Sequence, residues 1–259
     1  MLMLAALLWD VDGTVAETER DGHLVAFNEA FQALGLPWRW SIERYAELLR
    51  VTGGRERLLH DMATQADAPA SAAERERLAA ALHAEKNRRY GQLVERGAIA
   101  LRPGVLRLMN EATASGVQLA IATTTSRVNL EALLGAQLGA SWPTRFAAIV
   151  CGEDAPVKKP DPQVYLRCLD ALQLDADETL AIEDSPNGLA AARAAGIATL
   201  VTRSLNFASH AFEGALAVCD DLDHPAAPSP HLQGARAARI DLALLRHWHA
   251  AWWQEPLRA

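Results

Sequence analysis

Residues 4–14 read Leu-Ala-Ala-Leu-Leu-Trp-Asp-Val-Asp-Gly-Thr, an apolar run that ends on two aspartates separated by one residue. The run 4–9 is too short to cross a bilayer and has the continuous apolar character of a buried parallel strand. Side chains two positions apart on an extended chain point the same way, so Asp10 and Asp12 can face one reacting group. Gly13 allows the chain to turn away sharply. The stretch therefore predicts a buried strand that carries two carboxylates at its carboxyl end.

Two carboxylates in this position suit phosphoryl transfer. One can attack phosphorus and form an aspartyl-phosphate. The other can protonate the leaving oxygen and then take a proton from the attacking water. Such a pair beside a negatively charged phosphate needs a cation, and magnesium prefers oxygen ligands. Taken alone, the same motif also fits an aspartate-rich turn that only ends a strand.

Further apolar runs alternate with helical patterns along the chain. Strands are predicted at 117–122, 147–150, 179–182 and 198–201, with a weaker candidate at 217–219, and helices at 104–115, 127–138, 163–172 and 188–195. Strands that alternate with helices form a parallel sheet covered on both faces. The fold class is therefore α/β, with a Rossmann-like parallel-sheet core.

A helical insertion divides the first strand from the rest of this core. Its helices are predicted at 22–34, 42–49, 55–65 and 71–95, and the stretch contains no convincing strand. The predicted domains are a catalytic core of residues 1–18 and 96–225, a helical domain of residues 19–95, and a linker with a C-terminal helix in residues 226–259. Prolines in 221–233 predict the linker, and the last helix is expected at 235–253, with Ile240, Leu244, His247 and Trp248 near one face.

Three more polar motifs each follow a predicted strand. The hydroxyls and backbone amides of 122–126 can bind phosphate, although such a run also fits a simple helix cap. A lysine in 157–162, Val-Lys-Lys-Pro-Asp-Pro, can balance negative charge, although a basic proline-rich loop is commonly plain surface. Carboxylates in 182–188 can complete a magnesium site, and Ser185 and Pro186 predict a helix start by themselves.

Composition narrows the functional classes. The formal net charge of −7 argues against a general nucleic-acid binder, which normally carries a basic excess. The cysteines Cys151, Cys168 and Cys219 are scattered and lack a CxxC spacing, which favours reduced thiols in a cytoplasmic enzyme over a disulfide framework or a zinc site. No segment reaches transmembrane length, so we expect no membrane partner. Because of the negative net charge, we also expect no nucleic-acid partner.

Together, four of these motifs resemble those of the haloacid-dehalogenase superfamily. They are the run 10–14, Thr123, Lys159-Pro160 and Glu183-Asp184, in that order. The resemblance implies Asp10 as nucleophile, Asp12 as acid and base, Thr123 as phosphate ligand and Lys159 as charge stabiliser. It implies a Mg²⁺ cofactor held by Asp10, Asp184, the nearby Glu183 and the backbone carbonyl of Asp12. The second aspartate favours phosphate chemistry over dehalogenation.

The insertion resembles the four-helix cap of the phosphoglucomutase-like subfamily. The motifs Glu17-Thr18-Glu19, Thr52-Gly53-Gly54 and the run 122–127 are similar to those of the CbbY-type proteins. This resemblance covers nearly the whole chain. It implies a magnesium-dependent phosphatase of a small phosphorylated sugar, namely xylulose 1,5-bisphosphate, an inhibitory by-product of Rubisco.

A substrate with two phosphates needs a second anion site. We expect the substrate-binding residues to be Glu17, His23, Tyr45, Arg50, Thr52, Gly53, Gly54, Arg55, Thr124 and Arg127. Among them Arg50, Arg55 and Arg127 are the candidates for the distal phosphate. Arg55 stands where this subgroup commonly has lysine, and that exchange changes phosphate geometry.

Other functions share these motifs. A β-phosphoglucomutase-like phosphomutase would use the same aspartates but return the phosphoryl group to the sugar. A broader sugar-phosphate or phosphoglycolate phosphatase is a further alternative. A non-catalytic sugar-phosphate sensor would be expected to lack one of the core carboxylates, and all are present. We expect a monomer whose partner is its phosphosugar substrate.

Overall fold

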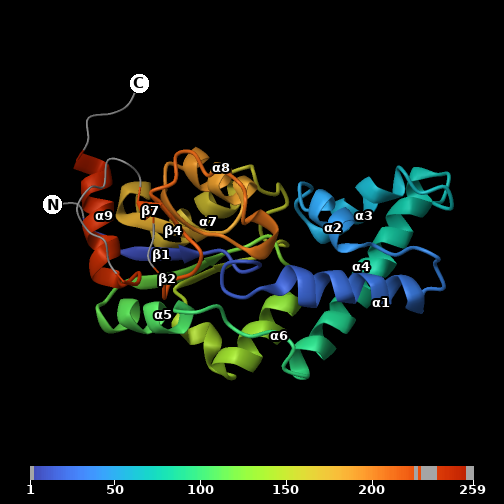
Figure 1. Ribbon diagram of the computed structural model, residues 1–259, viewed down its shortest axis with the longest axis horizontal. Helices are drawn as coiled ribbons and strands as arrows, with labels where there is room; N and C mark the ends of the chain where they lie inside the picture. Colours follow the sequence, from blue (N-terminus) through green and yellow to red (C-terminus); the bar gives the residue numbers. More distant parts are fainter. Residues whose placement is uncertain (1–2, 225–226, 229–237, 255–259) are drawn as a thin grey trace.

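The computed structural model describes residues 3–224, 227–228 and 238–254 (Figure 1). Its sheet has the order β3-β2-β1-β4-β5-β6-β7. The strands are β1 (Ala6–Trp9), β2 (Gln118–Ala122), β3 (Ala148–Val150), β4 (Thr179–Glu183), β5 (Ala198–Thr202), β6 (Ala217–Cys219) and β7 (Ala227–Pro228). The first six pair in parallel, which confirms the predicted α/β core, and β7 runs antiparallel to β6. Sequence reasoning missed β7, because the prolines around it indicated a linker.

Each face of the sheet has its own apolar layer. Along β1, Leu7 and Trp9 belong to one buried cluster, whereas Ala6 and Leu8 belong to another. The alternation follows from the two-residue period of a strand. The first cluster includes residues of α5 (Val105–Ala114), α6 (Arg127–Leu138) and α9 (Leu242–Gln254); the second includes residues of α7 (Gln163–Leu172) and α8 (Pro186–Ala194). Three short 3₁₀ turns lie at Trp142–Arg145, Ala176–Glu178 and Leu205–Phe207.

The C-terminal helix starts later than predicted. It begins at Leu242, and residues 238–241 are not helical, while 235–237 lie outside the described residues. Asp241 explains the start, because its carboxylate accepts a hydrogen bond from the Leu244 amide at 2.8 Å. His247 is exposed, so its predicted place on the packed face was wrong; Trp248 is buried there.

The predicted helical insertion is present. It consists of a π-helical turn, η1 (Glu19–Leu24), followed by α1 (Val25–Ala33), α2 (Ile42–Leu48), α3 (Gly54–Met62) and α4 (Ala72–Glu95). These helices lie together to one side of the sheet, opposite α9 (Figure 1). They enclose their own apolar cluster around Phe27, Phe31 and Trp40. Among the described residues, no helix combines the length and the apolar character needed to cross a membrane.

The register of the sheet places the predicted motifs side by side. Trp9, the last residue of β1, lies opposite Ile121 of β2 on one side and Ile182 of β4 on the other. The residues that follow these positions therefore emerge at one edge of the sheet, next to the inserted helices. Ligands of open parallel sheets bind outside this carboxyl edge.

Candidate active site

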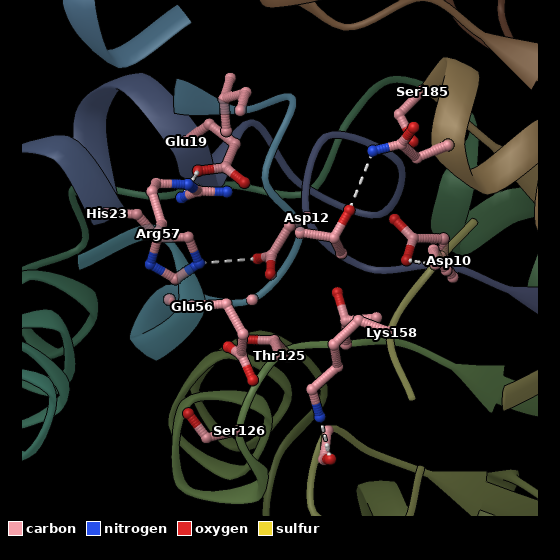
Figure 2. Close-up of a pocket in the computed structure, with 18 of the residues that line it drawn as sticks. Asp10, Asp12, Glu19, His23, Glu56, Arg57, Thr125, Ser126, Lys158 and Ser185 are labelled. Atoms are coloured by element: carbon pink, nitrogen blue, oxygen red, sulfur yellow. Dashed lines mark hydrogen bonds and ion pairs between the residues drawn. The ribbon is translucent and has the colours of Figure 1, made fainter. Parts of the chain in front are cut away.

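A pocket of about 510 Å³ lies between the carboxyl edge of the sheet and the inserted helices (Figure 2). Most residues that the sequence analysis selected contribute to its wall. These are Asp10, Asp12, His23, Arg50, Thr52, Gly53, Gly54, Arg55, Thr124, Lys159 and Asp184. The fold thus brings residues from the core and from the insertion to one cavity.

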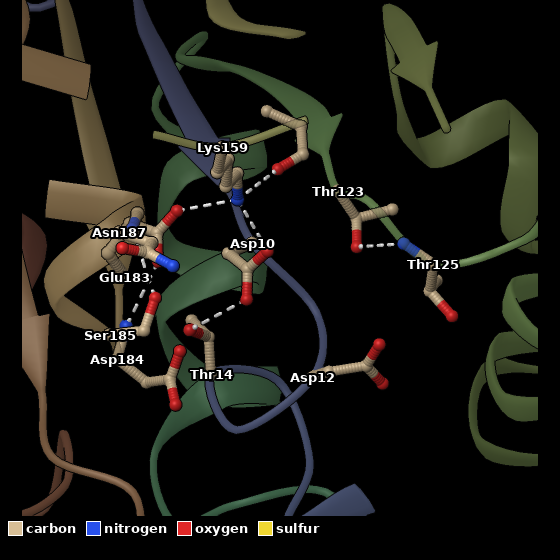
Figure 3. Close-up of polar contacts among 12 residues, drawn as sticks. Asp10, Asp12, Thr14, Thr123, Thr125, Lys159, Glu183, Asp184, Ser185 and Asn187 are labelled. Atoms are coloured by element: carbon tan, nitrogen blue, oxygen red, sulfur yellow. Dashed lines mark hydrogen bonds and ion pairs between the residues drawn. The ribbon is translucent and has the colours of Figure 1, made fainter. Parts of the chain in front are cut away.

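Lys159 connects the nucleophile candidate Asp10 to the acidic motif Glu183-Asp184. Its ammonium nitrogen lies 2.7 Å from Asp10 Oδ1 and 2.6 Å from Glu183 Oε1, and it also donates to the Ala122 carbonyl at 2.9 Å (Figure 3). Burial lowers the pKa of Lys159, but the two carboxylates outweigh burial and raise the pKa overall. Lys159 is therefore charged, as a stabiliser of negative charge must be.

Asp10 is buried and held at both oxygens. Its Oδ2 accepts a hydrogen bond from the Thr14 hydroxyl at 3.3 Å, a contact that sequence reasoning missed. Burial raises the pKa of Asp10 from 3.8 to about 7, against the opposing charge of Lys159 and with the help of the Glu183 carboxylate. A fixed orientation suits a carboxylate that attacks phosphorus, and so does a negative charge that burial destabilises.

Glu183 is completely buried in the core. Its Oε1 accepts from Lys159 and from the Tyr165 hydroxyl, and its Oε2 accepts from the Asp184 amide at 3.2 Å. These bonds orient Lys159. The amphipathic pattern of α7 indicated only a core position for Tyr165, so its hydroxyl could not be assigned from the sequence.

Asp10, Glu183 and Asp184 form a group suited to a metal ion. One carboxylate oxygen from each lies within 4.8 Å of the others. Burial and the charges of the other two carboxylates raise the pKa of Asp184 well above its usual value. A divalent cation would relieve this crowding, and oxygen donors of this kind are those that magnesium prefers. The residues therefore fit the expected Mg²⁺.

Gly13 permits the close approach that this group requires. Its φ is +85°, and a Cβ added there would lie 2.1 Å from Asp184 Oδ2. Any side chain would displace Asp184, so the turn after the aspartate pair depends on glycine for both its conformation and its space.

Asp12 points toward the inserted helices. Its Oδ1 accepts from the Thr18 hydroxyl at 2.6 Å and contacts His23 Nε2 at 3.0 Å. Burial raises the pKa of Asp12, but the charge of His23 and the hydrogen bonds from His23 and Thr18 lower it overall. Asp12 therefore stands in the pocket as a carboxylate that can receive a proton.

The hydroxyl-rich loop after β2 presents Thr124, Thr125 and Ser126 to the pocket. Thr123 itself is buried behind them, and its hydroxyl accepts from the Thr125 amide at 3.2 Å. In this structure Thr123 therefore shapes the loop and is not part of the pocket wall, whereas its neighbours Thr124, Thr125 and Ser126 are.

Three residues expected to bind substrate lie away from the pocket wall. Glu17 accepts from the Leu205 amide at 3.3 Å and is paired with a core arginine. Tyr45 is buried among the inserted helices, where Arg57 donates to its hydroxyl at 2.8 Å. Arg127 pairs with Asp154 at 2.7 Å. Each side chain already has protein partners, which a sequence pattern does not reveal.

The two arginines on the pocket rim, Arg50 and Arg55, differ in their contacts. Arg55 forms an exposed ion pair with Glu76, and Arg50 is exposed. Sequence reasoning missed Lys86, a buried lysine of α4 in the pocket, because the charged residues of this helix indicated a solvated face. Its place after Ala79 and Leu82 in the buried stripe of α4 was the available signal.

Burial lowers the pKa of Lys86 to about 8, and the charge of Arg57 adds to this effect. The carboxylates of Asp12 and Glu19 act in the opposite direction. The Lys86 ammonium also lies 5.2 Å from the centre of the Phe27 ring. Among the described residues, the ammonium of Lys86 donates only to Asn87 Oδ1, at 3.5 Å, so this buried cation is suited to a second anionic group of a ligand.

Comparisons with known proteins agree with this geometry. The family model for haloacid dehalogenase-like hydrolases matches residues 4–196. The CbbY protein of Cupriavidus necator is 50% identical over 247 residues, which cover 95% of this chain and 97% of that protein.

Two crystal structures of CbbY from Rhodobacter sphaeroides have the same fold, each with a TM-score of 0.79. One is a complex with phosphate and is 41% identical; the other is a mutant in complex with xylulose-(1,5)bisphosphate and is 40% identical. Each comparison covers 85% of this chain and 95% of the other. The chain belongs to the haloacid dehalogenase-like hydrolase family and is, within it, a phosphatase related to the CbbY proteins.

Proposed function

We propose that this phosphatase is magnesium-dependent and hydrolyses xylulose 1,5-bisphosphate. The observation that carries the proposal is the convergence of Asp10, Asp12 and Lys159 on one pocket that also contains the buried cation of Lys86. The complex of a 40% identical CbbY protein with xylulose-(1,5)bisphosphate supports this choice of substrate.

The metal would be held by Asp10 and Asp184, with Glu183 close by and with the backbone carbonyl of Asp12 as the family resemblance implies. When bound, Mg²⁺ would offset the charge of the phosphate and of these carboxylates. Asp184 has the strongest requirement for it, since its pKa is raised well above the usual value among the other two carboxylates.

The residues of the chain then supply the chemistry. Asp10 attacks phosphorus in line and becomes an aspartyl-phosphate. Lys159 offsets charge on the phosphoryl oxygens together with donors of the loop that Thr123 shapes. Asp12, once it has taken up a proton, gives it to the leaving alkoxide, and the resulting carboxylate then accepts a proton from the water that hydrolyses the intermediate.

Residues 19–95 would act as a cap that excludes water and selects the substrate. Lys86 would bind the distal phosphate, with Arg50 and Arg55 at the rim. His23, Thr52 and the Gly53-Gly54 turn would line the sugar. Glu17, Tyr45 and Arg127 would act indirectly, through the partners that hold them.

The test is phosphate release with Mg²⁺ from xylulose 1,5-bisphosphate, ribulose 1,5-bisphosphate and β-glucose 1-phosphate. The proposal expects a strong preference for xylulose 1,5-bisphosphate and no requirement for a bisphosphate activator. Interconversion of glucose phosphates without release of free phosphate would instead assign a phosphomutase.

A further inference from the structure

Asn187 joins the catalytic core to a segment of the insertion. Its side-chain amide donates to the Arg50 carbonyl at 3.2 Å and to the Thr52 hydroxyl at 3.0 Å. The two sides of this contact are separated by 135 residues or more along the chain, and all three residues line the pocket.

On the core side of this contact, Asn187 belongs to a capped helix. Asn187 lies in the first turn of α8, where the Ser185 hydroxyl accepts from the Gly188 amide at 3.0 Å and caps the helix. The turn follows directly on Asp184 of the metal group, beside which Figure 3 places Ser185 and Asn187. Asp184 and the amide of Asn187 are therefore held close together at the start of α8.

The other side of the contact belongs to the insertion, where backbone hydrogen bonds join Arg50, Val51 and Gly53 to neighbouring residues of α2 and α3. Segment 50–54 connects α2 to α3 and turns at Gly53, whose φ is +97°. Within the part of the chain that the structure describes, Asn187 is the only core residue whose side chain hydrogen-bonds to this segment. That amide is therefore a direct polar link between the segment and the core.

We propose that Asn187 is a positioning residue that fixes segment 50–54 relative to the metal side of the site and thereby selects substrates long enough to reach both. The inference rests on the proposed function, since it assumes a phosphosugar that extends from Asp10 to the insertion. A phosphate ester too short to reach the segment does not benefit from its position.

A second asparagine contact provides a matched comparison. Asn87 of α4 donates to the Ser126 hydroxyl at 3.1 Å and accepts from Asn129 of α6 at 2.9 Å. This contact also holds the insertion to the core, but it involves no atom of segment 50–54. It separates positioning of the segment from general docking of the insertion.

The experiment compares steady-state kinetics of Asn187→Ala on xylulose 1,5-bisphosphate and on acetyl phosphate, both with Mg²⁺. We expect kcat/KM for the bisphosphate to fall about tenfold, the factor that one net hydrogen bond supplies, and to change less than about twofold for acetyl phosphate. Thr52→Val should show part of this selective loss and Thr52→Ser, which keeps the hydroxyl, should restore it. In the double variant, the losses from Asn187→Ala and Thr52→Val should be less than additive.

Equal losses on both substrates, or no loss on either, would overturn the proposal. So would the same selective loss in Asn87→Ala, because general docking of the insertion would then explain it. The wild-type enzyme decides the proposed function separately. If it prefers another extended phosphosugar, that compound replaces the bisphosphate in the comparison. The prediction for Asn187 is then tested by the loss of kcat/KM on that compound relative to the loss on acetyl phosphate.

Discussion

His23 Nε2 lies 3.0 Å from Asp12 Oδ1, so the first turn of the insertion directly contacts the acid–base candidate of the core. The imidazole ring also packs against Tyr90, with the two ring centres 4.4 Å apart and the rings tilted by 33°. The charge of His23 and its hydrogen bond contribute to the lowered pKa of Asp12, although burial alone would raise that pKa. The protonation of this candidate residue of the core is thus coupled to a residue of the insertion.

Replacement of His23 should therefore affect stability in a pH-dependent way. An aspartate with a lowered folded-state pKa contributes stability above its unfolded pKa and loses it as the pH falls. His23→Gln should lower the free energy of unfolding at pH 7 by about 2 kcal/mol, a typical value for a hydrogen bond to a charged group. Urea unfolding of both proteins should show this difference shrink below pH 4. A difference that stays constant with pH would contradict the coupling.

Mg²⁺ should stabilise the protein more at high pH. The pKa of Asp10 is raised to about 7, so the metal-free protein loses stability as the pH rises from about 4 to about 7, where the buried carboxylate must ionise. A bound cation removes this penalty. The increase of Tm on adding Mg²⁺ should thus be larger at pH 8 than at pH 5. Differential scanning calorimetry measures it, and an equal increase at both pH values would exclude a metal on Asp10.

Asp10→Asn should abolish phosphate release and leave the fold intact, because the amide cannot form the aspartyl-phosphate. The Lys159 ammonium keeps Glu183 as its partner at 2.6 Å. Circular dichroism checks the fold, and a phosphate assay checks the turnover. Turnover close to that of the wild type would show that another residue attacks phosphorus.

Lys159→Met should be strongly destabilising, by about 3–5 kcal/mol, since it leaves the buried carboxylates of Asp10 and Glu183 without their cation. The double variant Lys159→Met with Glu183→Gln should recover part of this loss. Chemical unfolding of the wild type, of the single variants Lys159→Met and Glu183→Gln, and of the double variant measures the coupling. No recovery in the double variant would mean that Lys159 stabilises the protein independently of Glu183.

Deprotonation of Lys86 should lower the activity of the enzyme at high pH. Because the pKa of Lys86 is lowered to about 8, kcat/KM for a bisphosphate should decline above pH 8 as the ammonium loses its proton. Lys86→Met should lower kcat/KM about tenfold or more at pH 7 by removing a charged hydrogen bond to the distal phosphate. Acetyl phosphate serves as the control, since it has no second phosphate. Equal losses on both substrates would place Lys86 outside the distal site.

The sequence predicted those parts of the fold that depend on local pattern. Helices 127–138 and 163–172 have the bounds that their periodicity indicated. The start of α9 was misplaced, because apolar periodicity extended back past Asp241, whereas the carboxylate cap decides where the helix begins. Strand β7 depends on pairing with β6, a long-range contact that no local pattern of a proline-rich segment indicates.

The candidate site shows the same division. Asp10, Lys159 and Asp184 could be selected because the motifs that contain them together resemble those of a known superfamily, and the parallel register explains why strand ends that carry such motifs meet. Whether Tyr45 and Arg127 face the pocket could not be predicted from the sequence. Their orientation depends on tertiary partners, which are Arg57 for Tyr45 and Asp154 for Arg127. Lys86 was missed because a buried lysine on a helix rich in charges differs from its neighbours only through tertiary packing.

The separate apolar cluster of the insertion has a consequence for the order of folding. β1 pairs Ala6 with Gln118 and with Thr179, so the central strand of the sheet finds its neighbours only after more than a hundred residues have been made. Helices α1 to α4 contact one another over much shorter separations and bury Phe27, Phe31 and Trp40 among themselves. Local contacts form faster than distant ones. During synthesis the insertion can therefore collapse first, and it then shortens the effective loop that β1 must close.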